Sequence, residues 1–186
     1  MERSNQVLIV TTGHRTRLVV PSTAVIVVVV TLLLVARVGL TAKFPAYLYF
    51  VAVGVPIAVV DATTGKLPDR LTVPSYPILA VLLGAAEGAS PSQGSTTRGV
   101  VAAALLVAVF FASALLRGVG LGDVKLAGLL GLVLGFRSWT TVYAGMLVAF
   151  VLAAIFIGFS NIRRGNCVRI PLGPFLVAGT MVAILL

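Results

Sequence analysis

The chain has 186 residues, of which 59% are hydrophobic and only 10% are charged. Soluble domains carry about 25% charged residues, and a mean hydropathy of +1.12 is too high for a soluble fold of this size. A single cysteine excludes a disulfide scaffold, so the composition predicts an all-α, polytopic integral membrane helical bundle.

Charge-free apolar runs predict about seven transmembrane helices. In chain order, the runs cover residues 18–36, 44–60, 71–86, 99–116, 126–136, 138–162 and 170–186. The runs are continuous rather than alternating, so strands are not expected. The fifth run has 11 residues, fewer than the roughly 17 needed to cross a bilayer.

The first helix is expected to be retained rather than cleaved. Its apolar run is longer than the ~7–15 residues of a signal peptide, and no small-residue cleavage site follows it. We therefore predict a cytoplasmic tail over residues 1–17 and a transmembrane helix within 18–43. Residues 87–98 are rich in Ser, Gly, Thr and Gln, which predicts a flexible outer loop.

The basic residues predict how the chain lies in the plasma membrane. With the N-terminus in the cytoplasm, ten of the 14 Lys and Arg residues lie on the cytoplasmic side, as the positive-inside rule requires. The four outer ones are Arg37, Lys43, Arg98 and Arg137. Topology and anionic lipid headgroups account for the net charge of +9, so no nucleic-acid partner is expected.

Two of the five acidic residues adjoin apolar runs on the predicted cytoplasmic side. These are Asp61 and Asp123; Glu2 and Glu87 are expected to be solvated. An ionisable group at membrane depth predicts a functional site; alternatively, both aspartates only terminate helices at the headgroup level. The stop signal at Gly65 puts Asp61 in the last turn of its helix.

Asp123 is expected at the start of the short fifth helix, where a helix over 123–136 would rise only ~21 Å. This length would leave Asp123 recessed from the membrane surface. The preceding Gly120 and Gly122 allow irregular backbone and the close approach of a neighbour.

Two converging carboxylates can share a proton, so that one activates a water and the other acts as an acid. A helix N-terminus favours the anion and a C-terminus disfavours it. The positions therefore predict Asp123 as the base and Asp61 as its protonated partner.

Three segments resemble motifs of the type IV prepilin peptidases, which are GxGD membrane aspartyl proteases. Residues 120–126, GLGDVKL, match the GxGD signature. Asp61, followed by LPDRLT over 67–72, resembles the motif D-x(5)-[IL]-P-[ND]-x-L-T. Residues 169–176, RIPLGPFL, are similar to the family's IPFGPFL stretch.

The resemblance implies a catalytic membrane domain over 44–186, with Asp61 and Asp123 as the catalytic pair. It implies an aspartyl endopeptidase that removes the short basic leader from pilin or pseudopilin precursors on the cytoplasmic side. The expected partners are a precursor with a transmembrane N-terminal helix and membrane lipid. The chain lacks the methyltransferase domain of longer members, and no metal or cofactor is expected. Two aspartates also suit a small proton-coupled transporter, but both acids lie at one face and no repeat is seen.

The residues around the motifs leave alternatives open. Lys125 either steadies an anion or extends to the headgroups, and Asp69, after Pro68, is either a third carboxylate or a helix cap. The last motif either shapes the substrate cleft or starts the last helix, through Pro171, Gly173 and Pro174.

Small residues in the fifth run predict a helix-packing face, which contains one GxxxG motif. They are Gly128, Gly131 and Gly135. His14 and Cys167 are the only histidine and the only cysteine. Neither forms part of a metal or nucleophile pattern.

Overall fold

The computed structural model describes residues 23–65, 67, 69–116, 120–164 and 171–186, with only the backbone for 160–164. Within these ranges all regular structure is helical, which confirms the all-α class. The helices are Thr23–Val38, α2 (Phe44–Thr64), α3 (Asp69–Ala89), the short 3-10 helix η1 (Pro91–Gln93), α4 (Thr96–Leu115), α5 (Leu121–Arg137), α6 (Trp139–Arg164) and α7 (Gly173–Leu185). The predicted tail over 1–17 lies outside the described residues.

The seven predicted apolar runs correspond to seven α-helices in the described ranges, but these helices differ in length. Four segments are long and apolar enough to cross a membrane: Phe44–Thr64, Asp69–Ala89, Pro91–Leu115 and Trp139–Phe159. Thr23–Val38 and α7 are apolar but shorter. The number of crossing segments is thus approximate, whereas each run is confirmed to form a helix within its described residues.

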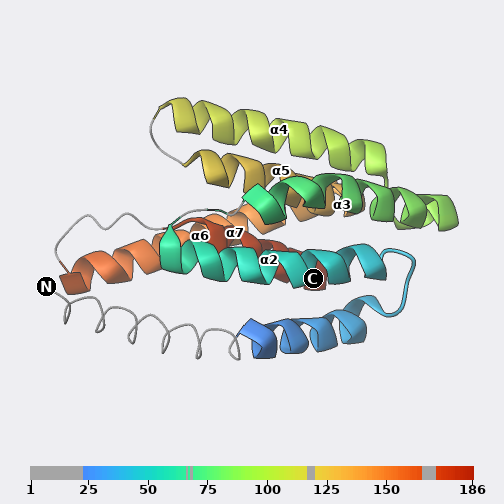
Figure 1. The fold of residues 1–186 in the computed structure, drawn as a ribbon, viewed down its shortest axis with the longest axis horizontal. Helices are drawn as coiled ribbons and strands as arrows, with labels where there is room; N and C mark the ends of the chain where they lie inside the picture. The colour runs from blue at the N-terminus through green and yellow to red at the C-terminus, as the bar shows by residue number, and fades with distance from the viewer. Residues whose placement is uncertain (1–22, 66, 68, 117–119, 165–170) are drawn as a thin grey trace, which may run out of the picture.

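Successive helices from α2 to α7 run in alternating directions (Figure 1). One end of the bundle, on the left in Figure 1, therefore collects the last turns of α2, α4 and α6. The first turns of α3, α5 and α7 lie at the same end. This end, which we call the acidic end, brings Asp61 and Asp123 to the same level.

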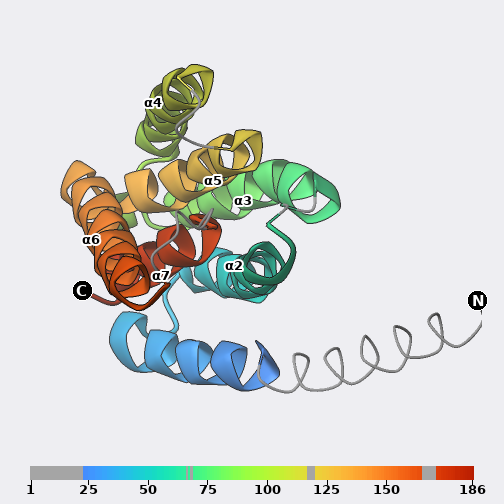
Figure 2. The same cartoon turned by 90° about the vertical axis from the view of Figure 1, so that its left-hand side faces the viewer.

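Helix α5 lies at the centre of the bundle. It contacts every other labelled α-helix, and the view along the helices shows α3, α4, α6 and α7 around it (Figure 2). Every residue from Leu126 to Phe136 is buried. Because protein rather than lipid surrounds α5, its apolar run does not have to be as long as the bilayer is thick.

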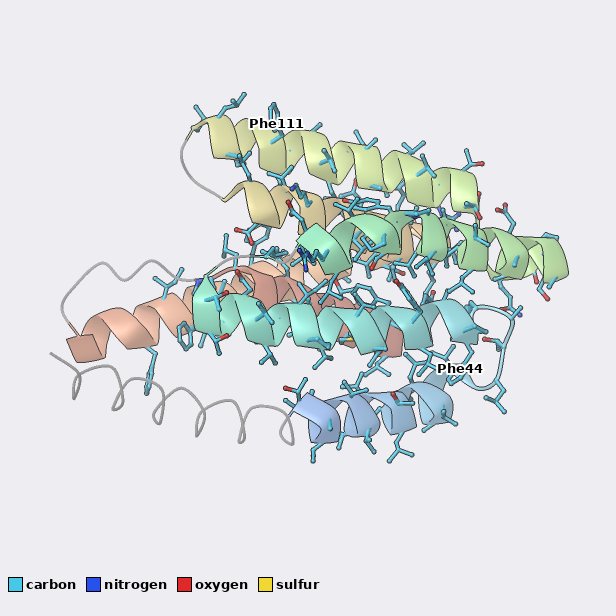
Figure 3. All side chains as sticks on the ribbon, in the orientation of Figure 1. Phe44 and Phe111 are labelled. Atoms are coloured by element: carbon cyan, nitrogen blue, oxygen red, sulfur yellow. The ribbon has the colours of Figure 1, made fainter. Side chains whose placement is uncertain are left out.

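The predicted small-residue face packs α5 against α4. A Cβ at Gly131 would lie 2.6 Å from Ala103 Cα, and a Cβ at Gly135 would lie 3.0 Å from Gly99 Cα. The two backbones therefore meet without intervening side chains, as a GxxxG contact requires. On the outer face of α4, the exposed Phe111 points away from the bundle, as Figure 3 shows.

The predicted outer loop over 87–98 is wrong in its bounds, because the connection between the two helices is shorter. Helix α3 continues to Ala89, η1 follows, and α4 already begins at Thr96. Glu87 is not merely solvated, because its Oε2 accepts a hydrogen bond from the Thr96 backbone N–H at 2.8 Å. The N–H of Ser95 donates to the Phe136 carbonyl at 2.9 Å. The segment is compact because its residues form hydrogen bonds with a free N–H at the start of α4 and a free carbonyl at the end of α5.

Candidate active site

Asp61 lies in the last turn of α2, as its distance from Gly65 predicts. Gly65 adopts the left-handed conformation (φ +63°), and its N–H donates to the Asp61 carbonyl oxygen at 2.8 Å. A residue with a side chain would be strained at this φ, so glycine ends the helix here. Asp61 is 3% exposed although it is only three residues before Thr64, the last residue of the helix.

Asp123 lies in the first turn of α5, where it is 9% exposed. Gly120 precedes the helix in an extended conformation, with a φ of −76° that any residue adopts. In the described residues, the glycines with positive φ are Gly39 and Gly65. The expected irregular backbone at the GxGD glycines is therefore not found.

The expected close approach is found at Gly122. A Cβ there would lie 2.9 Å from Leu67 Cδ1 and 3.2 Å from Leu67 Cβ. Leu67 belongs to the segment that follows Asp61, so this contact holds the two aspartate motifs against each other. Apart from the place of Leu67 in the first motif, no sequence pattern predicts this contact between Leu67 and Gly122.

Asp61 and Asp123 lie within electrostatic interaction range of each other. Both carboxylates are largely buried at the acidic end, and they come from helices α2 and α5, which contact each other. Two acids brought together in this way cannot both carry a full charge without cost, which is the arrangement that favours a shared proton.

The last motif contributes a backbone donor to this pair. The Gly173 N–H donates to Asp61 Oδ2 at 3.0 Å. Gly173 is the first residue of α7, and Leu172 and Pro174 flank it at the helix start. A Cβ at Gly173 would lie 2.5 Å from Asp61 Oδ2 and 3.0 Å from Asp61 Cγ. The stretch therefore starts the last helix and also contacts the candidate site.

This contact bears on the choice of base. The expected asymmetry had Asp61 at a helix C-terminus and Asp123 at a helix N-terminus. Both carboxylates in fact lie at helix N-termini, because α7 directs its first turn at Asp61 while α5 carries Asp123. Helix dipoles therefore favour the ionised form of the two carboxyl groups more equally than their own helix positions predict. The choice of Asp123 as base stays a prediction.

Lys125 pairs with Asp69. The Lys125 Nζ lies 2.8 Å from both Asp69 carboxylate oxygens. Asp69 is the first residue of α3 rather than a cap before it, and its side chain is 62% exposed. Pro171 lies partly buried just before α7, whereas Pro68 and Cys167 lie outside the described residues.

Tyr76 is a residue of this end that the sequence patterns missed. Its hydroxyl donates to the Lys125 carbonyl oxygen at 2.5 Å, so α3 holds Lys125 by both its side chain and its backbone. Among the described residues, no group of three or more His, Cys, Asp or Glu side chains could hold a metal ion.

Comparison with known proteins gives one match. Residues 47–159 match the model of the Type IV leader peptidase family, a range that includes both aspartate motifs and ends before Gly173. No curated protein matches the chain, and no solved structure matches it. The family is one of proteases, and the four long apolar helices make the chain a multi-pass membrane protein. Because the match covers more than half of the residues of this chain, the chain belongs to the type IV leader peptidase family.

Proposed function

We propose that this protein is an aspartyl endopeptidase that removes the short basic leader from pilin or pseudopilin precursors. The observation that carries the proposal is the juxtaposition of two buried carboxylates, Asp61 and Asp123, at one end of a leader-peptidase bundle. Elsewhere in the described residues, acidic side chains are exposed or serve as helix-end acceptors, as Asp69 and Glu87 do.

The reaction requires that one of the two carboxyl groups is ionised and that the other is protonated. The ionised member of the pair takes a proton from a water as the water oxygen attacks the peptide carbonyl carbon. The protonated member donates its proton to the carbonyl oxygen, which gives a neutral tetrahedral intermediate. The C–N bond then breaks as the leaving amine takes the proton held by the first carboxyl group. One hydroxyl of the intermediate returns its proton to the second carboxylate as the C=O bond re-forms, so the pair recovers its starting protonation state. Gly173 supports this step by holding Asp61 in place.

The position of the pair suits a substrate that is cut where it meets the membrane. We propose that the acidic end faces the cytoplasm and that the apolar segment of the precursor lies against the helices. The scissile bond would then reach Asp61 and Asp123 at the level of the lipid headgroups. The excess of basic residues expected on this side leaves a small surface for a basic leader.

The test is co-expression with pilin-like precursors, with the new N-terminus read by mass spectrometry. Asp61→Asn and Asp123→Asn keep the side-chain shape but remove the acid, so we expect each to lower cleavage by roughly 10³-fold or more, as loss of an essential acid or base does. Glu87→Gln is the matched control, since it changes a carboxylate at the other end of the bundle.

Cleavage that persists in both aspartate variants would rule out the two-aspartate mechanism. The wild type should cut after the leader glycine and leave the new N-terminus unmethylated. A well-folded wild type that cuts no precursor, but carries a proton flux that both variants abolish, would instead support the transporter alternative.

A further inference from the structure

One face of α3 holds a single residue of α5 at two points. Asp69 binds the Lys125 ammonium group through both carboxylate oxygens, and Tyr76 donates to the Lys125 carbonyl oxygen. Asp69 and Tyr76 are seven residues apart, which is two helical turns and puts them on the same side of α3. Both contacts fall next to the turn that carries Asp123.

Lys125 and Asp123 lie on opposite sides of that turn. Two residues correspond to about 200° around a helix axis, and burial agrees, because Asp123 is 9% exposed whereas the Lys125 side chain is 44% exposed. The Lys125 ammonium group is therefore bound to Asp69 on the far side of α5 from the Asp61–Asp123 pair.

Stability does not explain these contacts well. Ion pairs as exposed as Lys125–Asp69 add little to folding free energy. The Lys125 carbonyl lies inside α5, where the helix already supplies it with a backbone donor. The arrangement instead fixes the rotation of the first turns of α5 relative to α3.

Gly128 makes room for the Tyr76 contact. A Cβ at this position would collide with the Tyr76 hydroxyl oxygen and would lie 2.6 Å from Val107 Cγ2. Tyr76 reaches the Lys125 carbonyl only because α5 has no side chain one turn further along.

We propose that Lys125, Asp69 and Tyr76 are positioning residues, which hold the first turn of α5 so that the Asp123 carboxylate faces Asp61. This inference rests on the proposed function for its kinetic test, but its geometric test does not. Without these contacts the turn rotates or shifts, and the two acids lose the alignment needed to act on one water.

The kinetic test compares Lys125→Met, Asp69→Asn and Tyr76→Phe on a cleavable precursor. We expect kcat to fall about tenfold for the first two variants and about threefold for Tyr76→Phe, with KM within twofold of wild type, since misalignment affects the chemical step. Exchanging the two charges, with Asp69→Lys and Lys125→Asp in one chain, should restore most of kcat. Tyr143→Phe, which removes a hydroxyl from an exposed tyrosine of α6, is the control.

The geometric test needs no activity. Asp61→Cys and Asp123→Cys are combined in a Cys167→Ser background and treated with a short bismaleimide. We expect cross-linking to fall at least threefold when Lys125→Met is added and to return when the two charges are exchanged.

Unchanged kcat and unchanged cross-linking in all three variants would overturn the proposal. A raised KM with normal kcat would also overturn it, because Lys125 would then contact the substrate. If wild type cuts no precursor but cross-linking still depends on Lys125, the proposed function fails and the positioning role stands.

Discussion

At the scale of single residues, Gly173 gives the sharpest prediction. We expect Gly173→Ala to lower the single-turnover cleavage rate about 2- to 10-fold, because a hydrogen bond to a neutral group contributes about 0.5–1.5 kcal/mol and about 1.4 kcal/mol is a tenfold change in rate. The added Cβ would lie 2.5 Å from Asp61 Oδ2 and would displace the carboxylate from the Gly173 N–H. The measurement is the rate of leader removal with enzyme in excess.

Gly84→Ala is the matched control for this substitution. A Cβ at Gly84 would meet no atom within 4 Å, so this variant should keep the wild-type rate. Alanine is the better helix former of the two residues, which means that a loss at Gly173 cannot come from helix propensity. A Gly173→Ala protein with full activity would show that the hydrogen bond to Asp61 has no role.

The sequence predicted where the two aspartates fall but not what surrounds them. Asp61 was placed by the glycine four residues after it, and Asp123 by the start of an apolar run, both of which are local signals. Gly173 is 112 residues from Asp61, and Leu67 reaches Gly122 only once α2 and α5 have packed. No periodicity within one helix encodes such contacts. The three motifs therefore predicted the candidate site, whereas the hydrogen-bond donors and neighbours around it could be identified only from the structure.

At the scale of helices, Arg98 is expected to stabilise the end of α5. Its guanidinium group donates to the carbonyl oxygens of Gly135, Phe136 and Arg137 at 2.6–2.8 Å. These carbonyls have no donor within the helix. We expect Arg98→Met to lower the free energy of unfolding by about 1–3 kcal/mol, measured by denaturant titration in detergent with Trp139 fluorescence.

Arg37→Met provides the comparison, since it removes an arginine whose side chain is exposed at the end of Thr23–Val38. It should change the free energy of unfolding by less than about 0.5 kcal/mol. Equal effects of the two substitutions would mean that Arg98 acts only through its charge.

The helices themselves were largely predictable, and the errors fall at their ends. The fifth helix was predicted over 123–136, from an apolar run of 126–136. Helix α5 spans Leu121–Arg137, so it begins two residues earlier and ends one residue later. Residues 87–98 were predicted to be a loop because of their serine and glycine content, and here too the helix ends were placed wrongly. Serine and glycine are typical of loops, yet here they allow Glu87 and Arg98 to reach backbone groups of other helices.

At the scale of the whole molecule, the described residues place two buried carboxylates at one end of the bundle and two guanidinium groups that bind helix carbonyls at the other. The acidic end holds Asp61 and Asp123, where the first turns of α5 and α7 converge. At the other end, Arg98 and Arg137 use their guanidinium groups to bind the last carbonyls of α5 and α7. Lys43, just before α2, also lies near Arg137, and burial together with that charge lowers the pKa of Lys43.

This polarity makes the orientation testable. Counted on the sequence, the segments predicted to be cytoplasmic hold ten basic residues and the predicted outer segments hold four, so we expect the acidic end to face the cytoplasm. Thr63→Cys and Ser92→Cys, each in a Cys167→Ser background, place a thiol at an exposed position of opposite ends. A membrane-impermeant maleimide should label Cys at position 92 in intact cells and at position 63 only after permeabilisation. The reverse pattern would put Asp61 and Asp123 outside, where a leader retained in the cytoplasm could not reach them.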